Sequence, residues 1–82
     1  MAADPFQELI EALRHEGLVE DARWLSGVLT VAYTTSSEMY GKLGQMMSRI
    51  HRSIPVDSAR RLRSHFEECS RTVKKVWPMY QL

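Results

Sequence analysis

The sequence has little of what holds many small proteins together, because its 82 residues include one cysteine, three prolines and four glycines. Since Cys69 has no second cysteine to pair with, no intrachain disulfide can form, and a reducing compartment is expected. The longest mainly apolar run, residues 28–33, is far shorter than the roughly 20 residues that a membrane-spanning helix needs. The N-terminus lacks the basic and apolar segments of a signal peptide. These absences predict a cytoplasmic protein.

The sequence also lacks a recognisable catalytic, cofactor-binding or metal-binding signature. His65 and Cys69 are four residues apart and share a helix face, but they supply only two metal ligands. His51, a third candidate ligand, lies beside a predicted turn on another helix. No nucleophile, base and orienting residue form a catalytic pattern. We therefore expect no enzyme activity, no cofactor and no metal.

The charge is nearly balanced, with 11 basic and 10 acidic residues, but the two signs are separated along the chain. Residues 1–41 carry two basic and seven acidic side chains, whereas residues 42–82 carry nine basic and three acidic ones. Either the two halves lie against each other, within one chain or between two copies, or the basic half offers a face to an acidic partner.

All apolar periodicity in the sequence is helical, and no segment alternates as a strand would. The spacing predicts four helices, at about residues 5–16, 20–33, 36–52 and 57–77. The connections between the first and second and between the third and fourth are short, which makes each pair antiparallel neighbours. The fold class is therefore all-α, a small four-helix bundle of two antiparallel helical hairpins.

Local signals mark where several of these helices begin and end. Asp4 is placed to cap the first helix, and Gly17 to end it in the left-handed conformation that glycine tolerates. Thr35 and Glu38 form a capping-box pattern at the start of the third helix. Pro55 separates the third helix from the fourth, because the residue before a proline is disfavoured in helical conformation.

The last helix has the clearest pattern, an apolar seam whose members are alternately three and four residues apart. The seam comprises Ala59, Leu62, Phe66, Cys69, Val73, Val76 and Tyr80. It predicts one continuous helix that Pro78 ends near Trp77. The residues after it are apolar for a chain end, so Trp77 and Tyr80 are expected to pack on the bundle or on a second subunit.

A stripe of small residues runs along the third helix and is the most distinctive feature of the sequence. Ser37, Gly41, Gly44 and Ser48 follow one another at intervals of four, three and four residues. Each glycine inside a helix costs about 0.5–1 kcal/mol relative to alanine. Such a stripe is therefore expected where another helix approaches closely, whether from the same chain, a second copy or a partner. It is not a phosphate site, because the glycines lie inside the helix and not before it.

Three methionines, Met39, Met46 and Met47, lie beside the stripe. They are read either as core filling or as part of an adaptable groove for a partner helix. The predicted partner or dimer interface comprises Ser37, Met39, Gly41, Gly44, Met47, Ser48, Trp77 and Tyr80.

The last helix also carries a cluster of basic residues, comprising Arg60, Arg61, Arg63, Arg71, Lys74 and Lys75. Arg63, Glu67 and Arg71 form an i, i+4 ladder that is typical of a solvated helix face. Arg60 and Arg61, however, lie near the helix start, where the helix dipole disfavours positive charge. That placement favours contact with a partner.

The apolar content exceeds what so small a bundle can cover. Trp24, the methionines and the tail around Trp77 all need burial, which favours a homodimer. The separated charges would suit such a dimer.

One resemblance adds to this reading. Trp24-Leu25 in the second helix, followed by a Thr/Ser-capped helix that reads EMYGKL at residues 38–43, resembles short uncharacterised bacterial all-helical proteins. The resemblance extends over about residues 20–65, and it implies a bacterial origin but no activity.

The preferred functional hypothesis is a non-enzymatic helical interaction protein that presents one face to a protein partner. Within this class, a toxin-neutralising immunity or antitoxin protein fits by analogy, because such proteins are often small and charge-polarised. The alternative is a small nucleic-acid-associated regulator that uses the basic face of the last helix, although the net charge of +1 is low for this role.

Overall fold

Five helices form the described part of the chain, residues 4–31 and 35–82 of a computed structural model, and these residues contain no strand. The helices are α1 (Pro5–His15), α2 (Val19–Thr30), α3 (Ser36–Ser53), α4 (Val56–Arg61) and α5 (Arg63–Val76). A non-helical C-terminal tail, residues 77–82, follows α5.

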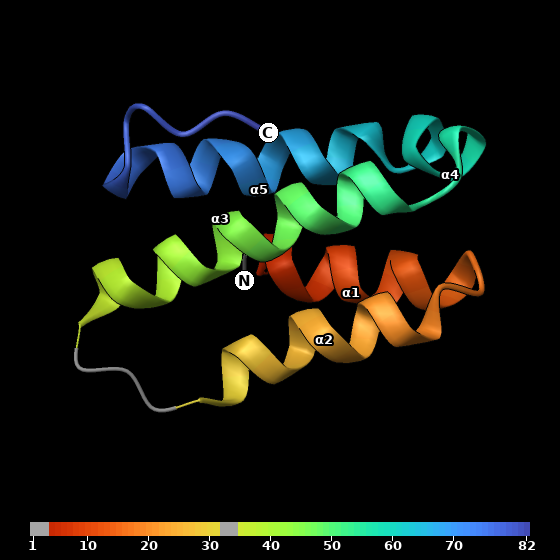
Figure 1. Cartoon of the computed structure of the whole chain (residues 1–82), viewed down its shortest axis with the longest axis horizontal. Coiled ribbons are helices and arrows are strands. Elements are labelled where there is room, and N and C mark those ends of the chain that lie inside the picture. Colours follow the sequence, from red (N-terminus) through yellow and green to blue (C-terminus); the bar gives the residue numbers. More distant parts are fainter. Residues whose placement is uncertain (1–3, 32–34) are drawn as a thin grey trace.

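Each of the four longer helices packs against two of the other three. α1 contacts α2 and α5, and α3 also contacts α2 and α5, while the short α4 contacts α5. Figure 1 shows that α1 and α3 run in one direction and α2 and α5 in the opposite one, so each contacting pair among the longer helices is antiparallel. The same view shows α3 lying between α2 and α5.

The ends of α1 have the caps that its sequence predicts. Asp4 Oδ1 accepts a hydrogen bond from the Phe6 N–H at 2.9 Å. At the other end Gly17 has φ +79°, and the N–H groups of Gly17 and Leu18 donate to the carbonyls of Arg14 and Leu13, both at 2.9 Å. This pair of bonds is the Schellman motif, which ends a helix by satisfying its last carbonyl groups.

The start and end of α3 are likewise set by local chemistry. Thr35 Oγ1 accepts from the Glu38 N–H at 3.2 Å, as the capping-box pattern predicts. The helix ends at Ser53, after which Ile54 is extended, with φ −80° and ψ 159°, because Pro55 follows it.

The predicted end of the second helix is wrong. α2 stops at Thr30, and Val31 is extended, with φ −75° and ψ 138°, whereas the sequence predicted helix as far as residue 33. Residues 32 and 33 lie outside the described part of the chain. The last turn of α2 contains Gly27, Val28 and Thr30, whose low helix propensity accounts for the early end.

The predicted fourth helix is divided in two. The backbone departs from helical geometry at Leu62, with φ −94° and ψ 7°, between α4 and α5. Leu62 still keeps the seam's buried position and is 3% exposed. The break redirects α4 toward the end of α1, where Arg61 contacts Glu16. Because this contact is 45 residues away in sequence, the heptad spacing gave no sign of it.

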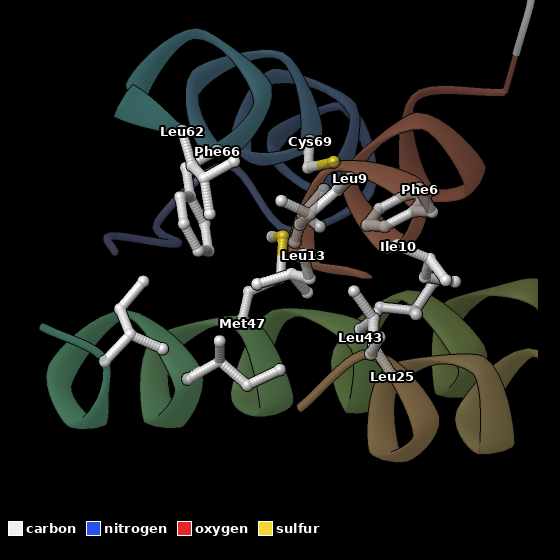
Figure 2. Packing of buried hydrophobic residues seen from close by; sticks show 14 residues of the cluster. Phe6, Leu9, Ile10, Leu13, Leu25, Leu43, Met47, Leu62, Phe66 and Cys69 are labelled. Atoms are coloured by element: carbon white, nitrogen blue, oxygen red, sulfur yellow. The ribbon is translucent and has the colours of Figure 1, made fainter. Parts of the chain in front are cut away.

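The buried hydrophobic side chains form one core to which α1, α2, α3 and α5 contribute, and α4 adds the buried Ser58 and the partly buried Ala59 at its edge. The large and fully buried ones are Leu9, Ile10, Leu13, Leu25, Leu43, Met47, Phe66, Cys69 and Val73. Figure 2 shows Leu9 and Leu13 of α1 at the centre of this cluster, between Cys69 of α5 and Met47 of α3. α1 contributes a whole helix face to the core, because Phe6 is also only 3% exposed.

The described chain is compact. Its radius of gyration is 11.9 Å, against about 11.7 Å for a folded chain of this length. Within the described ranges, no helix has both the length and the apolar character that crossing a bilayer requires.

Gly17 and Gly27 offer a matched test of the α1 cap, because an added Cβ would meet no atom within 4 Å at either position. Gly17→Ala should lower the free energy of unfolding by about 1–2 kcal/mol, since only Gly17 has a left-handed backbone. Gly27→Ala, inside α2, should raise it by about 0.5–1 kcal/mol. Urea denaturation of both variants measures the difference, and equal effects would contradict the cap.

Candidate functional site

The small-residue stripe of α3 is covered by the chain's own C-terminal tail. The indole Nε1–H of Trp77 donates to the Ser37 carbonyl at 2.9 Å, and the same ring lies over Gly41. A Cβ added at Gly41 would lie 3.5 Å from Trp77 Nε1, an ordinary contact distance. The stripe is therefore covered by aromatic side chains of the tail, with α5 packed alongside α3.

Tyr80 makes the closest approach to the stripe. Its hydroxyl donates to the Gly44 carbonyl at 2.7 Å and lies 3.2 Å from Ser48 Oγ. A Cβ at Gly44 would lie 2.7 Å from Tyr80 Cε1 and 3.2 Å from Val73 Cγ1, so no larger residue fits without movement. Burial raises the pKa of the Tyr80 hydroxyl, against the opposing effect of the Ser48 hydrogen bond. Tyr80 is thus a protonated donor that anchors the tail.

The anchored tail creates a groove beside α3. It has a volume of about 740 Å³ and is lined by Gly41, Gln45, Ser48, Arg49, Arg52, Val73, Trp77, Pro78, Met79 and Tyr80. The lining contains two arginines and no carboxylate, histidine or cysteine. Apolar, aromatic and arginine side chains together are typical of protein recognition surfaces. The lining residues include no pair of acid and base groups that could act in catalysis. We call this feature the tail groove.

Large apolar side chains are exposed both on the tail and on α2. Met79 is 91% and Trp77 47% exposed on the tail, and Trp24 is 57% exposed on α2. A single chain therefore leaves uncovered the Trp24 side chain for which the sequence analysis expected cover from a second copy. The reason is helix geometry, because the neighbouring Leu25 occupies the buried side of α2 and Trp24 is turned about a quarter of a revolution away.

A smaller hollow separates Trp24 from α3. It has a volume of about 230 Å³ and is lined by Glu20, Asp21, Trp24, Met46, Arg49, Ile50 and Ser53. Arg49 lines both this hollow and the tail groove. The exposed side of α3 therefore has an acidic, aromatic helix on one flank and the apolar tail on the other.

The residues of the predicted partner or dimer interface are distributed between the surface and the core. Ser37, Gly41, Ser48, Trp77 and Tyr80 meet at the tail contact described above. Met39 is half-buried and packs against the core, and Met47 is fully buried within it. Met47 therefore contributes to the core and has no accessible surface to offer a partner.

Only four of the ten residues that line the groove, Gly41, Ser48, Trp77 and Tyr80, belong to the predicted interface. Of the other six, Val73 of α5 was predicted only as a residue of the apolar seam. Gln45, Arg49 and Arg52 lie on α3, and Pro78 and Met79 lie on the tail. The α3 residues could have been found, because Gln45, Arg49 and Arg52 follow Gly41 at intervals of four, four and three and so share one side of the helix. The tail residues carried no such signal, since their position depends on where the chain folds after Trp77.

The predicted basic face is only partly available. Arg61 binds the Glu16 carboxylate through two nitrogens at 2.6 to 3.0 Å, and Arg63 Nε lies 3.0 Å from Glu67 Oε1. The second step of the predicted ladder, from Glu67 to Arg71, is not among the ion pairs of the described residues. Arg71, Lys74 and Lys75 are exposed on α5, and Arg60 is exposed on α4.

The Glu16–Arg61 pair joins the end of α1 to α4. The Glu16 carboxylate is 18% exposed and the Arg61 side chain 60% exposed. The hydrogen bond from Arg61 lowers the pKa of Glu16 below its ordinary value of 4.5. The sequence analysis took the position of Arg61 near a helix start, where the helix dipole disfavours positive charge, as a sign of a partner. The pair with Glu16 explains this position within the chain itself.

Cys69 is a core residue. Its thiol is fully buried and donates to the Pro5 carbonyl at 3.3 Å. Burial raises the pKa of this thiol to about 12, so it is neither a thiolate nucleophile nor a ready metal ligand at neutral pH. Among the residues that the structure describes, no three His, Cys, Asp or Glu side chains are grouped closely enough to hold a metal ion.

Comparison with protein-family models, with curated proteins and with solved structures found no match to this chain.

Gly44 and Gly41 provide a matched test of the tail contact. Gly44→Ala should lower the free energy of unfolding by about 1–3 kcal/mol, because its Cβ would overlap the Tyr80 ring. Gly41→Ala should be neutral or stabilising by up to about 1 kcal/mol, since it removes a helical glycine without a clash. Chemical denaturation compares the two, and a Gly44→Ala protein as stable as the Gly41→Ala protein would show that Tyr80 is not held there.

The Glu16–Arg61 pair predicts a pH dependence of stability. Because the folded-state pKa of Glu16 is lowered, its contribution is present above about pH 4.5 and is lost as the pH falls through the folded-state value. The stability advantage of the wild type over Glu16→Gln should therefore disappear in acid. Denaturation of both proteins between neutral pH and about pH 3 measures it, and an advantage that persists throughout would contradict the assignment.

Proposed function

We propose that this chain is a non-enzymatic helical interaction module that presents the tail groove to another protein surface. The observation that carries the proposal is the groove itself, with its apolar lining, two arginines and flanking exposed Trp77 and Met79. Tryptophan, tyrosine and arginine are the residues that contribute most to binding at protein interfaces. A surface of this composition is typical of a recognition site.

The finer features of the proposal concern assembly. The helix arrangement supports a small bundle of two antiparallel hairpins, α1 with α2 and α3 with α5, to which α4 is a short addition. A homodimer would cover Trp24, Trp77 and Met79, which one chain leaves exposed. A cytoplasmic immunity or antitoxin protein of bacterial origin belongs to this class, because such proteins act by covering a surface of their target.

The alternative of a nucleic-acid-associated regulator rests on the exposed basic residues. Four basic side chains form no ion pair within the described part of the chain. They are Arg60 on α4 and Arg71, Lys74 and Lys75 on α5. Two of the six predicted members, Arg61 and Arg63, are already paired with carboxylates. The smaller basic surface makes protein binding the better supported function.

A charge-matched pair of variants tests the tail groove. Met79→Glu places a carboxylate on the exposed tail, and Gln7→Glu places one on the exposed surface of α1, outside the groove lining. Met79→Glu should weaken association at least ~10-fold, equivalent to about 1.4 kcal/mol, and Gln7→Glu should leave it unchanged. Sedimentation of the purified chain measures self-association, and affinity capture from the native host measures binding to other proteins.

Two results would contradict the proposal. One is a wild-type chain that neither self-associates nor captures a protein, and the other is equal association by the two variants. Binding to DNA or RNA that is strong at low salt, falls steeply with added salt and is lost in Lys74→Glu would support the regulator instead.

A further inference from the structure

The exposed side of α2 has the chemistry that the tail groove lacks. Glu20, Asp21 and Trp24 lie within about one turn of one another on α2, and Val31 is the extended residue directly after the helix. Trp24 is 57% and Val31 55% exposed, so these side chains form an acidic and apolar stripe on the surface. We call these four residues the α2 stripe.

The tail groove and the α2 stripe are complementary in charge and in apolar character. The groove lining carries Arg49 and Arg52 with no carboxylate, whereas the first turn of α2 carries Glu20 and Asp21. An apolar groove beside two arginines fits an occupant that is apolar, aromatic and acidic. The α2 stripe is such an occupant.

The placement of the two surfaces suits a symmetric dimer. Figure 1 shows α3 between α2 and α5, whose tail completes the groove, and Arg49 of α3 lines the hollows on both sides. A two-fold axis parallel to α3, across its exposed side, would therefore bring the α2 of each copy opposite the tail groove of the other. Both contacts would form together, and the assembly would close as a dimer.

We propose that a second copy of this chain occupies the tail groove and inserts its α2 stripe, with Trp24 against Met79 and Trp77 and its carboxylates toward Arg49 and Arg52. This inference rests on the proposed use of the groove as a protein-binding surface and names its occupant. The copy supplies residues that complete the site in each direction. It also covers the exposed apolar side chains of α2 and of the tail at the same time.

Two variants at exposed positions test the contact. Trp24→Ala removes the aromatic member of the α2 stripe, and Met79→Glu alters the groove, while 57% and 91% exposure makes both compatible with folding. Circular dichroism checks that the helices are intact. Since each substitution affects both contacts of a symmetric dimer, each should raise the dimer dissociation constant at least ~100-fold in a sedimentation series. Gln7→Glu should leave it unchanged.

A mixture of the two variants identifies which surfaces meet. In the mixed dimer, the intact groove of the Trp24→Ala copy meets the intact α2 stripe of the Met79→Glu copy, and both substitutions fall in the other contact. Two substitutions in the same contact weaken it less than the sum of their separate effects, because the contact is already broken by either one. The dissociation constant of the mixed dimer should therefore be at least ~10-fold lower than the geometric mean of the dissociation constants of the two variant homodimers. Titration of a fluorescently labelled variant with the other measures this.

The outcomes separate this inference from the proposed function. If Trp24→Ala dimerises as the wild type does while Met79→Glu does not, the groove is an interface but α2 is not its occupant. If the mixed dimer binds at the geometric mean, groove meets groove and stripe meets stripe, which also overturns the inference. If the wild type is monomeric at about 100 μM and captures another protein through the groove, the function stands and the occupant is heterologous. If no association involves Met79, both fail.

Discussion

The Tyr80 ring lies so close to Gly44 that a side chain on residue 44 would overlap it. The tail groove depends on this contact. A Cβ at Gly44 would be 2.7 Å from Tyr80 Cε1, while the Tyr80 hydroxyl donates to the Gly44 carbonyl. The absence of a side chain at Gly44 lets Tyr80 approach α3, and a partly buried hydrogen bond holds it there. Trp77 anchors the start of the tail in the same way, because its indole N–H donates to the carbonyl of Ser37, near the start of α3.

The anchored tail has consequences for the surface around it. With Trp77 and Tyr80 turned toward α3, Met79 between them is left 91% exposed, and the tail becomes one wall of the groove. The other wall is the side of α3 that carries Arg49 and Arg52. Gly44, which weakens the helix, thus has a structural purpose, because a Cβ at this position would lie 2.7 Å from Tyr80 Cε1. The core that buries Leu9 and Leu13 also packs against Tyr80, whereas Trp24 and Met79 remain exposed.

Features set by neighbouring residues could be predicted from the sequence. The Asp4 and Thr35 caps, the left-handed Gly17 and the extended residue before Pro55 all depend on chemistry within a few residues. Buried positions could also be read from the helical period, as Leu62, Phe66, Cys69 and Val73 show. Two predicted helix bounds failed. α2 ends early at Thr30, after residues of low helix propensity, and the last helix breaks at Leu62, where α4 meets α1 through Arg61 and Glu16.

The candidate site shows the same division. The sequence marked the small-residue stripe and the aromatic tail as unusual, because helical glycines and an apolar chain end both carry a cost. It left open which backbone covers the stripe, since spacing along one helix contains no information about its neighbour. It also could not show that Arg49 and Arg52 line a groove or that Trp24 is exposed.

Local backbone chemistry and periodicity therefore determined the helices, their caps and most of the buried face, because these depend on residues close together in sequence. The tertiary structure alone decided that Trp77 and Tyr80 of the same chain lie on Ser37, Gly41 and Gly44, contacts between residues 36 to 40 apart. Such contacts arise from the shapes of separate segments once they are packed together. They leave no periodic trace in the sequence.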